Sequence, residues 1–159
     1  MKIRVGFGYD VHQLAEGPEF FLGGIKIPAE FGAVGHSDAD VLIHAICDAL
    51  LGAANLGDIG KHFPDNSNKY ENIDSKILLK QVVKLIKDKG FNIGNIDSTI
   101  CLQTPKLGNY ITAMKEALSI VMDIDIDDLS IKATTTEKMG FVGEEKGISA
   151  YAVVLIQQF

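Results

Sequence analysis

Three side chains in the first third of the sequence have the types and spacing of a metal site. Asp10 and His12 are separated by one residue within residues 3–12, whose alternation predicts a β-strand, so both side chains project from one face. With His44 they provide two imidazoles and one carboxylate, a set that suits Zn²⁺ with its fourth position open for catalysis. The spacing alone also fits a strand-end acid beside a hydrogen-bonded core histidine, so two interpretations stay open.

His44 falls within a helical pattern, and the residues one turn away on either side, Asp40 and Asp48, are acidic. A carboxylate that accepts a hydrogen bond from the second ring nitrogen of a ligating histidine fixes the tautomer of that histidine. We therefore expect Asp40 or Asp48 to orient His44. Cys47, on the same pattern, is most simply a small core residue.

The segment Thr134-Thr135-Thr136-Glu137 follows a predicted strand and allows two interpretations. Its S/T-x-x-E spacing is that of a capping box at the start of a helical turn. Alternatively, the hydroxyls and free backbone N–H groups bind phosphate oxygens, while Glu137 supplies a hard oxygen ligand to Mg²⁺ or Mn²⁺. The two interpretations are compatible.

Three further segments have a functional and a structural interpretation each. His36, Ser37 and Asp38 precede the helical pattern, where a helix N-terminus favours a phosphate beside His36; equally, Ser37 or Asp38 simply caps the helix. Residues 57–60 indicate a C-cap with a tight turn, and their glycines also allow close approach of a ligand. Lys106 follows a proline and could meet a diphosphate, or lie in a solvated turn.

The elements that would position these side chains follow from the hydrophobic periodicity. Strands are predicted at residues 3–12, 95–103, 129–134 and 148–156, a hairpin or bulge at 20–27, helices at 38–55, 74–89 and 110–121, and a polar loop at 61–73. This order predicts an α+β fold in which helices cover one face of a mixed or antiparallel sheet. The last strand is apolar on both faces, so its second face meets either a neighbouring subunit or the interior of the same chain.

The amino-acid composition limits the classes of protein to which this chain can belong. The length of 159 residues, of which 47% are hydrophobic, fits one domain spanning residues 1–159. A net charge of −6 opposes nucleic-acid binding, so metal ions or backbone dipoles would have to meet a polyanionic ligand. Two cysteines provide no disulfide framework, which favours a reducing compartment. No apolar run approaches about 18 residues and no signal-peptide pattern is present, so we expect a cytoplasmic protein without membrane contact.

Taken together, these motifs occur in an order and spacing that cover nearly the whole chain. They are Gly8-Tyr9-Asp10-Val11-His12, His36-Ser37-Asp38-Ala39-Asp40, His44-Ala45, Asp48-Ala49-Leu50-Leu51-Gly52-Ala53, Gly57-Asp58-Ile59-Gly60, Phe63-Pro64-Asp65, Pro105-Lys106 and Thr134-Thr135-Thr136-Glu137-Lys138. The combination resembles the 2-C-methyl-D-erythritol 2,4-cyclodiphosphate synthases of the non-mevalonate isoprenoid route. It is far more specific than any one motif and favours the functional interpretation of Asp10, His12, His44 and Glu137.

The resemblance implies a homotrimeric lyase whose active sites lie between neighbouring subunits. Asp10, His12 and His44 would hold Zn²⁺, Glu137 would hold a second divalent ion, Mg²⁺ or Mn²⁺, and His36 and Thr135 would stabilise the transition state. Besides the zinc ligands, the residues implied to hold the methylerythritol phosphate part are His36, Ser37, Asp58, Ile59, Gly60, Phe63, Pro64, Asp65, Asn66 and Ser67. Those implied to hold the cytidine diphosphate part are Leu102, Gln103, Thr104, Pro105, Lys106, Leu107, Gly108, Thr134, Thr135, Thr136, Glu137, Phe141 and Glu144.

The implied reaction converts 4-diphosphocytidyl-2-C-methyl-D-erythritol 2-phosphate to the 2,4-cyclodiphosphate and CMP, by attack of the 2-phosphate on the β-phosphorus. A phosphate monoester has a second pKa of about 6, so the nucleophile is largely dianionic at neutral pH and needs no general base. Repulsion between the anions and the charge that develops on the bridging oxygen are the obstacles, which two cations and oriented hydrogen-bond donors offset.

The chain departs from the family pattern after Gly143. The family commonly places an arginine there, whereas this chain has Glu144-Glu145-Lys146, and the added negative charge predicts a weaker isoprenoid-diphosphate pocket at a threefold axis. Two other functions are alternatives to the cyclase. One is a metal-dependent phosphohydrolase in which water replaces the 2-phosphate, and the other is a non-catalytic trimer that binds a metal or a nucleotide.

Overall fold

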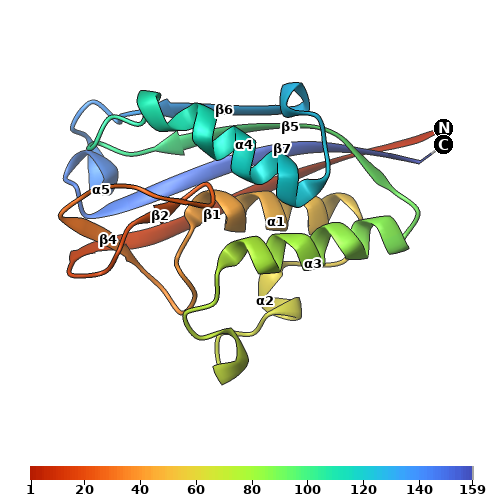
Figure 1. Cartoon of the computed structure of the whole chain (residues 1–159), viewed down its shortest axis with the longest axis horizontal. Helices are drawn as coiled ribbons and strands as arrows, with labels where there is room; N and C mark the ends of the chain where they lie inside the picture. Colours follow the sequence, from red (N-terminus) through yellow and green to blue (C-terminus); the bar gives the residue numbers. More distant parts are fainter. Residues whose placement is uncertain (159) are drawn as a thin grey trace.

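Two long strands at the ends of the chain form the middle of the sheet. In the computed structural model, which describes residues 1–158, β1 (Lys2–Glu16) pairs antiparallel with β7 (Gly147–Gln158), so the two termini lie together at one end of the molecule (Figure 1). The sheet is completed by β4 (Phe31–Val34), β5 (Asn92–Cys101) and β6 (Leu129–Thr134), in the order β4-β1-β7-β5-β6. Only the β5–β6 pair is parallel, so the predicted mixed sheet is confirmed.

The helices and the remaining short elements surround this sheet. The helices are α1 (Val41–Ala53), α2 (Ile59–His62), α3 (Ser75–Asp88), α4 (Ile111–Met122) and α5 (Gly140–Gly143). A small hairpin of β2 (Phe21–Leu22) and β3 (Ile25–Lys26) and three single turns, η1 (Asn68–Tyr70), η2 (Gly108–Tyr110) and η3 (Ile126–Asp128), complete the fold. Helix α1 packs on β1 and β7, α4 on β6, and α3 on both α1 and α4. Figure 1 shows α2 and η1 projecting beyond α3, away from the sheet.

Two glycines explain why α1 can lie so close to β1. A Cβ atom added to Gly6 would stand 1.9 Å from the carbonyl oxygen of Ala49, and one added to Gly8 would stand equally close to that of Ala45. Both clashes are with helix backbone, which cannot give way, so only glycine permits this approach. Because Asp10 and His12 continue the same period-2 face, the approach also brings them to the helix.

The opposite face of the sheet is apolar and exposed. In β7 the residues at even positions from Ile148 to Ile156 are buried under the helices, whereas Tyr151 and Val153 on the other face are 40% and 45% exposed. The interpretation in which the last strand is buried on both faces within one chain is therefore wrong. The exposed apolar side chains on this face are Ile3, Val5, Phe7, Tyr9, Val11, Tyr151 and Val153.

The long elements agree with the sequence, but the caps of α1 do not. The N-cap of α1 is Asp40, which accepts from the Ile43 N–H, rather than Ser37 or Asp38. The helix ends at Ala53 with Ala54 as its C-cap, followed by Asn55 in the left-handed region, so the predicted cap at residues 57–60 is also wrong. The predicted polar loop at 61–73 contains the end of α2 and the whole of η1. The edge strand β4 and the short α5 were not predicted, because four residues are too few for a periodicity to show.

Candidate active site

The predicted metal ligands converge. Asp10 Oδ2 lies 2.9 Å from His12 Nε2 and 3.2 Å from His44 Nδ1, and the two ring nitrogens lie 3.2 Å apart. Tetrahedral zinc with bonds of the usual length holds neighbouring ligand atoms about 3.3 Å apart. The three atoms are therefore spaced as three corners of such a tetrahedron, and among the described residues this is the one cluster of potential ligands found.

Charge and tautomer also fit a cation at this point. Burial would raise the pKa of Asp10, but the neighbouring rings of His12 and His44 outweigh burial and lower it to about 2, so the carboxylate is ionised at neutral pH. His12 Nδ1 lies 3.0 Å from the carbonyl oxygen of Val34 in β4, to which it must donate, so its Nε2 presents a lone pair. The edge strand that sequence reasoning missed thus orients one of the ligands.

The predicted support for His44 is wrong. Asp40 faces away from the ring and accepts from the backbone N–H groups of Gly23 and Gly24 at 2.9 and 2.7 Å. Asp48 accepts from the Ile59 N–H at 2.8 Å. Both acidic groups, one helical turn from His44, accept hydrogen bonds from backbone N–H groups of other segments instead. The local spacing of the sequence could not indicate these donors.

The ligands open into a cavity of about 350 Å³. Of the residues implied to hold the methylerythritol phosphate part, His36, Ser37, Ile59, Gly60, Phe63 and Asp65 line it. His36 Nε2 contacts the Ser67 carbonyl oxygen at 3.0 Å, which ties the loop before η1 to the cavity wall. Asp58 instead caps α2 through the Lys61 N–H, while Pro64 and Asn66 are exposed. The lining residues that sequence reasoning left out are Tyr9, Gly35, Asp48, Tyr70 and Leu78.

The Thr134–Glu137 segment is a tight turn and not a helix start. The Glu137 N–H donates to Thr135 Oγ1 at 3.2 Å, and the Thr136 hydroxyl donates to the Met139 carbonyl oxygen at 2.7 Å. Glu137 and Lys138 both adopt positive φ, and α5 begins only at Gly140. The capping-box interpretation is therefore wrong, and the exposed Glu137 carboxylate is left without an intrahelical role.

A groove of about 330 Å³ lies where the parallel strands β5 and β6 end. The Leu102 N–H donates to the Thr134 carbonyl oxygen at 3.0 Å, which holds the two strand exits together. Residues lining the groove are Leu102, Gln103, Pro105, Lys106, Leu107, Gly108, Ile111, Ala133, Thr134 and Thr135. Thr104 points instead to Glu145, its hydroxyl donating at 2.9 Å, and Glu144 forms an ion pair with Lys146. Phe141 lies beside Gly147, where its ring would clash with an added Cβ atom.

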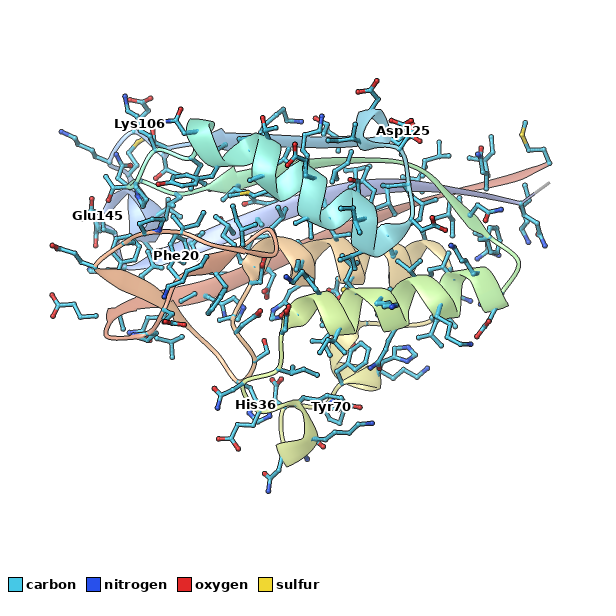
Figure 2. The ribbon with its side chains drawn as sticks, viewed as in Figure 1. Phe20, His36, Tyr70, Lys106, Asp125 and Glu145 are labelled. Carbon is cyan, nitrogen blue, oxygen red and sulfur yellow. The ribbon has the colours of Figure 1, made fainter. Side chains whose placement is uncertain are left out.

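Within one chain the cavity and the groove are far apart. Asp10 pairs with Ala150 across the sheet, and Ala150 pairs with Ile100. Ile100 pairs in turn with Ala133, next to the Thr134 turn. Three strand spacings therefore separate the two sites by about 14 Å. Figure 2 shows the same separation, with His36 and Tyr70 by the loop beyond α3 and Lys106 on the far side of the molecule.

Fold and site together define an α+β protein that carries a three-ligand pocket for a divalent cation. The model of the YgbB family matches residues 3–157, and the chain belongs to this family. A 2-C-methyl-D-erythritol 2,4-cyclodiphosphate synthase from Bacteroides fragilis is 67% identical over 158 residues, which cover 99% of each chain.

Solved structures agree with this assignment. The bifunctional IspDF from Campylobacter jejuni superimposes with a TM-score of 0.96 and 40% identity, covering 99% of this chain and 43% of that chain. The IspF–CDP complex from Plasmodium falciparum has a TM-score of 0.86 and 37% identity, covering 98% of this chain and 96% of that chain. Of the residues that the structure describes, no helix is long and apolar enough to cross a membrane.

Proposed function

We propose that residues 1–159 form one catalytic domain that converts 4-diphosphocytidyl-2-C-methyl-D-erythritol 2-phosphate to 2-C-methyl-D-erythritol 2,4-cyclodiphosphate and CMP in the cytoplasm. This is a phosphorus–oxygen lyase reaction of non-mevalonate isoprenoid precursor synthesis. The family, the full-length similarity to synthases of that name and the two free cysteines support the proposal. The observation that carries it is the convergence of Asp10, His12 and His44 on one point in a cavity of an acidic protein.

In the proposed step an oxygen of the 2-phosphate forms a bond to the β-phosphorus, and the bond from that phosphorus to the bridging oxygen breaks. The bridging oxygen and its electron pair leave with CMP. Zn²⁺ on the triad, and Mg²⁺ or Mn²⁺ on Glu137, would supply positive charge that stabilises the phosphoryl oxygens. No proton has to be removed from the nucleophile, because a phosphate monoester is largely dianionic at neutral pH.

The chain's own residues bring the two phosphate groups together. Ser37, on the wall of the cavity, would donate a hydrogen bond to the methylerythritol phosphate part, and His36, whose Nε2 is held by the Ser67 carbonyl oxygen, would line the same part of the site. Backbone N–H groups and the Thr135 hydroxyl at the groove would orient the diphosphate, while Lys106 adds one positive charge. Holding both reacting groups in one site removes most of the orientational cost of ring closure.

Glu137 fits a magnesium ion that arrives with the substrate. Mg²⁺ keeps several waters and is usually bound by one or two carboxylates together with phosphate oxygens, rather than by a complete protein cage. One exposed carboxylate beside a turn in which the Thr135 hydroxyl keeps its proton for a ligand meets that requirement. It also explains why no second ligand cluster is found among residues 1–158.

We infer that the cavity of one subunit works with the groove of another. The uncovered apolar face of β1 and β7 supports this inference, because exposed patches of this kind mark sites of subunit association. On it Tyr151 packs against Tyr9 and Phe7, with ring centroids 5.0 and 6.4 Å apart. A homotrimer packed through this face would place the groove of one subunit beside the cavity of the next. The site would then not have to bridge the distance that separates the cavity and the groove within one chain.

Mixed subunits test the shared site. His44→Ala damages only the cavity and Glu137→Gln only the groove, so the first variant alone should be nearly inactive and the second should keep about a tenth of wild-type turnover or less. In a random one-to-one mixture of the two, half of the cavities and half of the grooves are intact, so about a quarter of the subunit boundaries should regain wild-type turnover. The two unfolded variants are mixed and refolded together, and the rate of CMP release by the refolded mixture is then measured. No recovery above the separate variants would contradict a site built from two subunits.

Product analysis separates the cyclase from its alternatives. ³¹P NMR of the wild-type reaction should show a cyclic diphosphate appearing together with CMP. A linear phosphate product would instead identify a phosphohydrolase. The absence of any CMP after loading with Zn²⁺ and Mg²⁺ would identify a protein that only binds a metal or nucleotide.

A further inference from the structure

The first residue of α3 lies against the metal triad. Ser75 is fully buried, and its Oγ is 2.9 Å from His44 Nε2, the ring nitrogen that faces away from the other two ligands. Ser75 is fastened to Asp38 twice: its backbone N–H donates to Oδ2 at 3.0 Å and its hydroxyl to Oδ1 at 2.5 Å. Asp38 therefore orients both the helix start and the serine hydroxyl.

The number of protons available decides which atom donates and which accepts in each of these hydrogen bonds. A serine hydroxyl has one proton, and of its two neighbours the carboxyl group of Asp38, at 2.5 Å, is nearer and the stronger acceptor. The Ser75 proton is thus committed to Asp38, and the Ser75 oxygen must accept from His44. His44 then carries its proton on Nε2, and the lone pair of its Nδ1 faces the point between Asp10 and His12 where a metal ion would be held.

Ser37 does not replace this contact. Its Oγ lies 3.2 Å from His44 Nε2, which is longer than the Ser75 contact, and it already accepts from the Ala39 N–H. Ser37 also lines the cavity, where it is available to a ligand. Ser75, by contrast, is out of reach of any ligand in the cavity because it is fully buried.

We propose that Ser75 and Asp38 are positioning residues that hold His44 in the tautomer and orientation required of a metal ligand. A neutral histidine without a fixed partner divides between two tautomers, only one of which has a lone pair on Nδ1. A partner of this kind typically changes metal affinity 10- to 100-fold, by orienting the ring and raising its basicity. The inference depends on the proposed metal role of the triad and does not depend on the reaction.

Two measurements on Ser75→Ala test it. The dissociation constant of Zn²⁺, from competition with a chromophoric chelator, should rise about 10-fold. In the metal-free protein, ¹⁵N NMR of the histidine rings should show His44 as the Nε2–H tautomer in the wild type and as a mixture in the variant. Ser119→Ala is the matched control, because Ser119 is also a buried serine but its hydroxyl binds the Glu116 carbonyl oxygen in α4. It should leave both measurements unchanged.

A double-mutant cycle tests the part played by Asp38. Asp38→Asn should weaken Zn²⁺ binding in the wild-type background, and should weaken it less once Ser75 is alanine, because Asp38 acts on the ring only through the hydroxyl. Equal affinity and an unchanged tautomer in Ser75→Ala, beside tight binding by the wild type, would overturn the positioning role and leave the metal site standing. A wild type that binds no divalent ion would overturn both.

Discussion

The cavity around the metal triad and the groove at the ends of β5 and β6 are built in different ways. The triad is held by side chains from β1 and α1 whose second contacts come from β4 and α3, so nearly every polar atom is fixed within one chain. The groove consists of strand exits and a turn, and its acidic residue, Glu137, is exposed. One region is organised before any ligand arrives, whereas the proposed function completes the other with a partner subunit and a substrate-borne ion.

The strongest test of this difference removes a ligand from the organised region. His44→Ala should lose most bound zinc and reduce turnover at least about a thousandfold, because two ligands do not hold the ion that stabilises the phosphoryl charge. The chain should stay folded, since α1 is anchored by its other buried residues. Zinc analysis and circular dichroism measure both effects. His62→Ala is the control, because His62 Nε2 contacts the Leu56 carbonyl oxygen outside the triad. Full zinc occupancy in a folded His44→Ala protein would refute the site.

The second test separates the two regions without touching either. Phe7 is 63% exposed on the uncovered sheet face, so Phe7→Glu should prevent association and abolish most turnover, while zinc content per chain stays near that of the wild type. Light scattering and metal analysis measure these quantities. Ile120→Glu, on α4 and 79% exposed, introduces the same charge away from that face and should change neither. An active monomer of Phe7→Glu would show that one chain suffices.

The third test affects the groove alone. Glu137→Gln should lower turnover about 10- to 100-fold with little change in CMP affinity, because the neutral amide keeps the turn but binds Mg²⁺ poorly. Steady-state rates and CMP titration measure the two quantities. Glu116→Gln, on the exposed side of α4, is the matched control. Loss of CMP affinity equal to the loss of turnover would assign Glu137 to nucleotide binding instead.

The fourth test compares the effect of one substitution on the free energy of unfolding at a buried carboxylate, Asp40 at the start of α1, and at an exposed one, Asp97 on β5. Asp40 is fully buried and accepts from the Gly23 and Gly24 N–H groups, so Asp40→Asn turns an amide N–H₂ toward donors and should cost about 2–3 kcal/mol. Asp97, on β5, forms an exposed ion pair with Lys132, and Asp97→Asn should cost about 0.5 kcal/mol. Urea unfolding at neutral pH measures both. Equal losses of unfolding free energy in the two variants would contradict the difference between the buried and the exposed carboxylate.

The effect of Asp97 should also depend on pH in a defined direction. The hydrogen bond from Lys132 lowers the pKa of Asp97 in the folded chain. Its contribution is therefore present above the unfolded pKa of about 3.9 and is lost as the pH falls through the lower folded value. The stability difference between wild type and Asp97→Asn should shrink in acid, and a difference that grows in acid would contradict the ion pair.

Several parts of the molecule could be read from the sequence because they depend on local order. The period of two in β1 places Asp10 and His12 on one face, and β6 was predicted with its observed bounds. The predicted stop of α3 at Gly90 agrees with the positive φ of that glycine. Each of these features depends on neighbours within a few residues, and such neighbours are written in the sequence.

The local sequence gave the wrong partner for His44 and no sign of the partner for His12. Val34 and Ser75 reach these histidines from segments 22 and 31 residues away, while Asp40 and Asp48, close in sequence, turn to other donors. Gly6 and Gly8 allow α1 to approach β1 closely, but the spacing of residues in the sequence did not predict this approach.

The sequence by itself thus determined the types of the ligands, the faces on which they stand and the family of the chain. Only the tertiary structure decided which atoms hold the second ring nitrogens, and that the cavity and the Glu137 turn are three strands apart. The physical reason is that a hydrogen bond or a strand pairing between distant segments depends on which donors remain free after the whole chain has folded. No periodicity along the sequence records that competition.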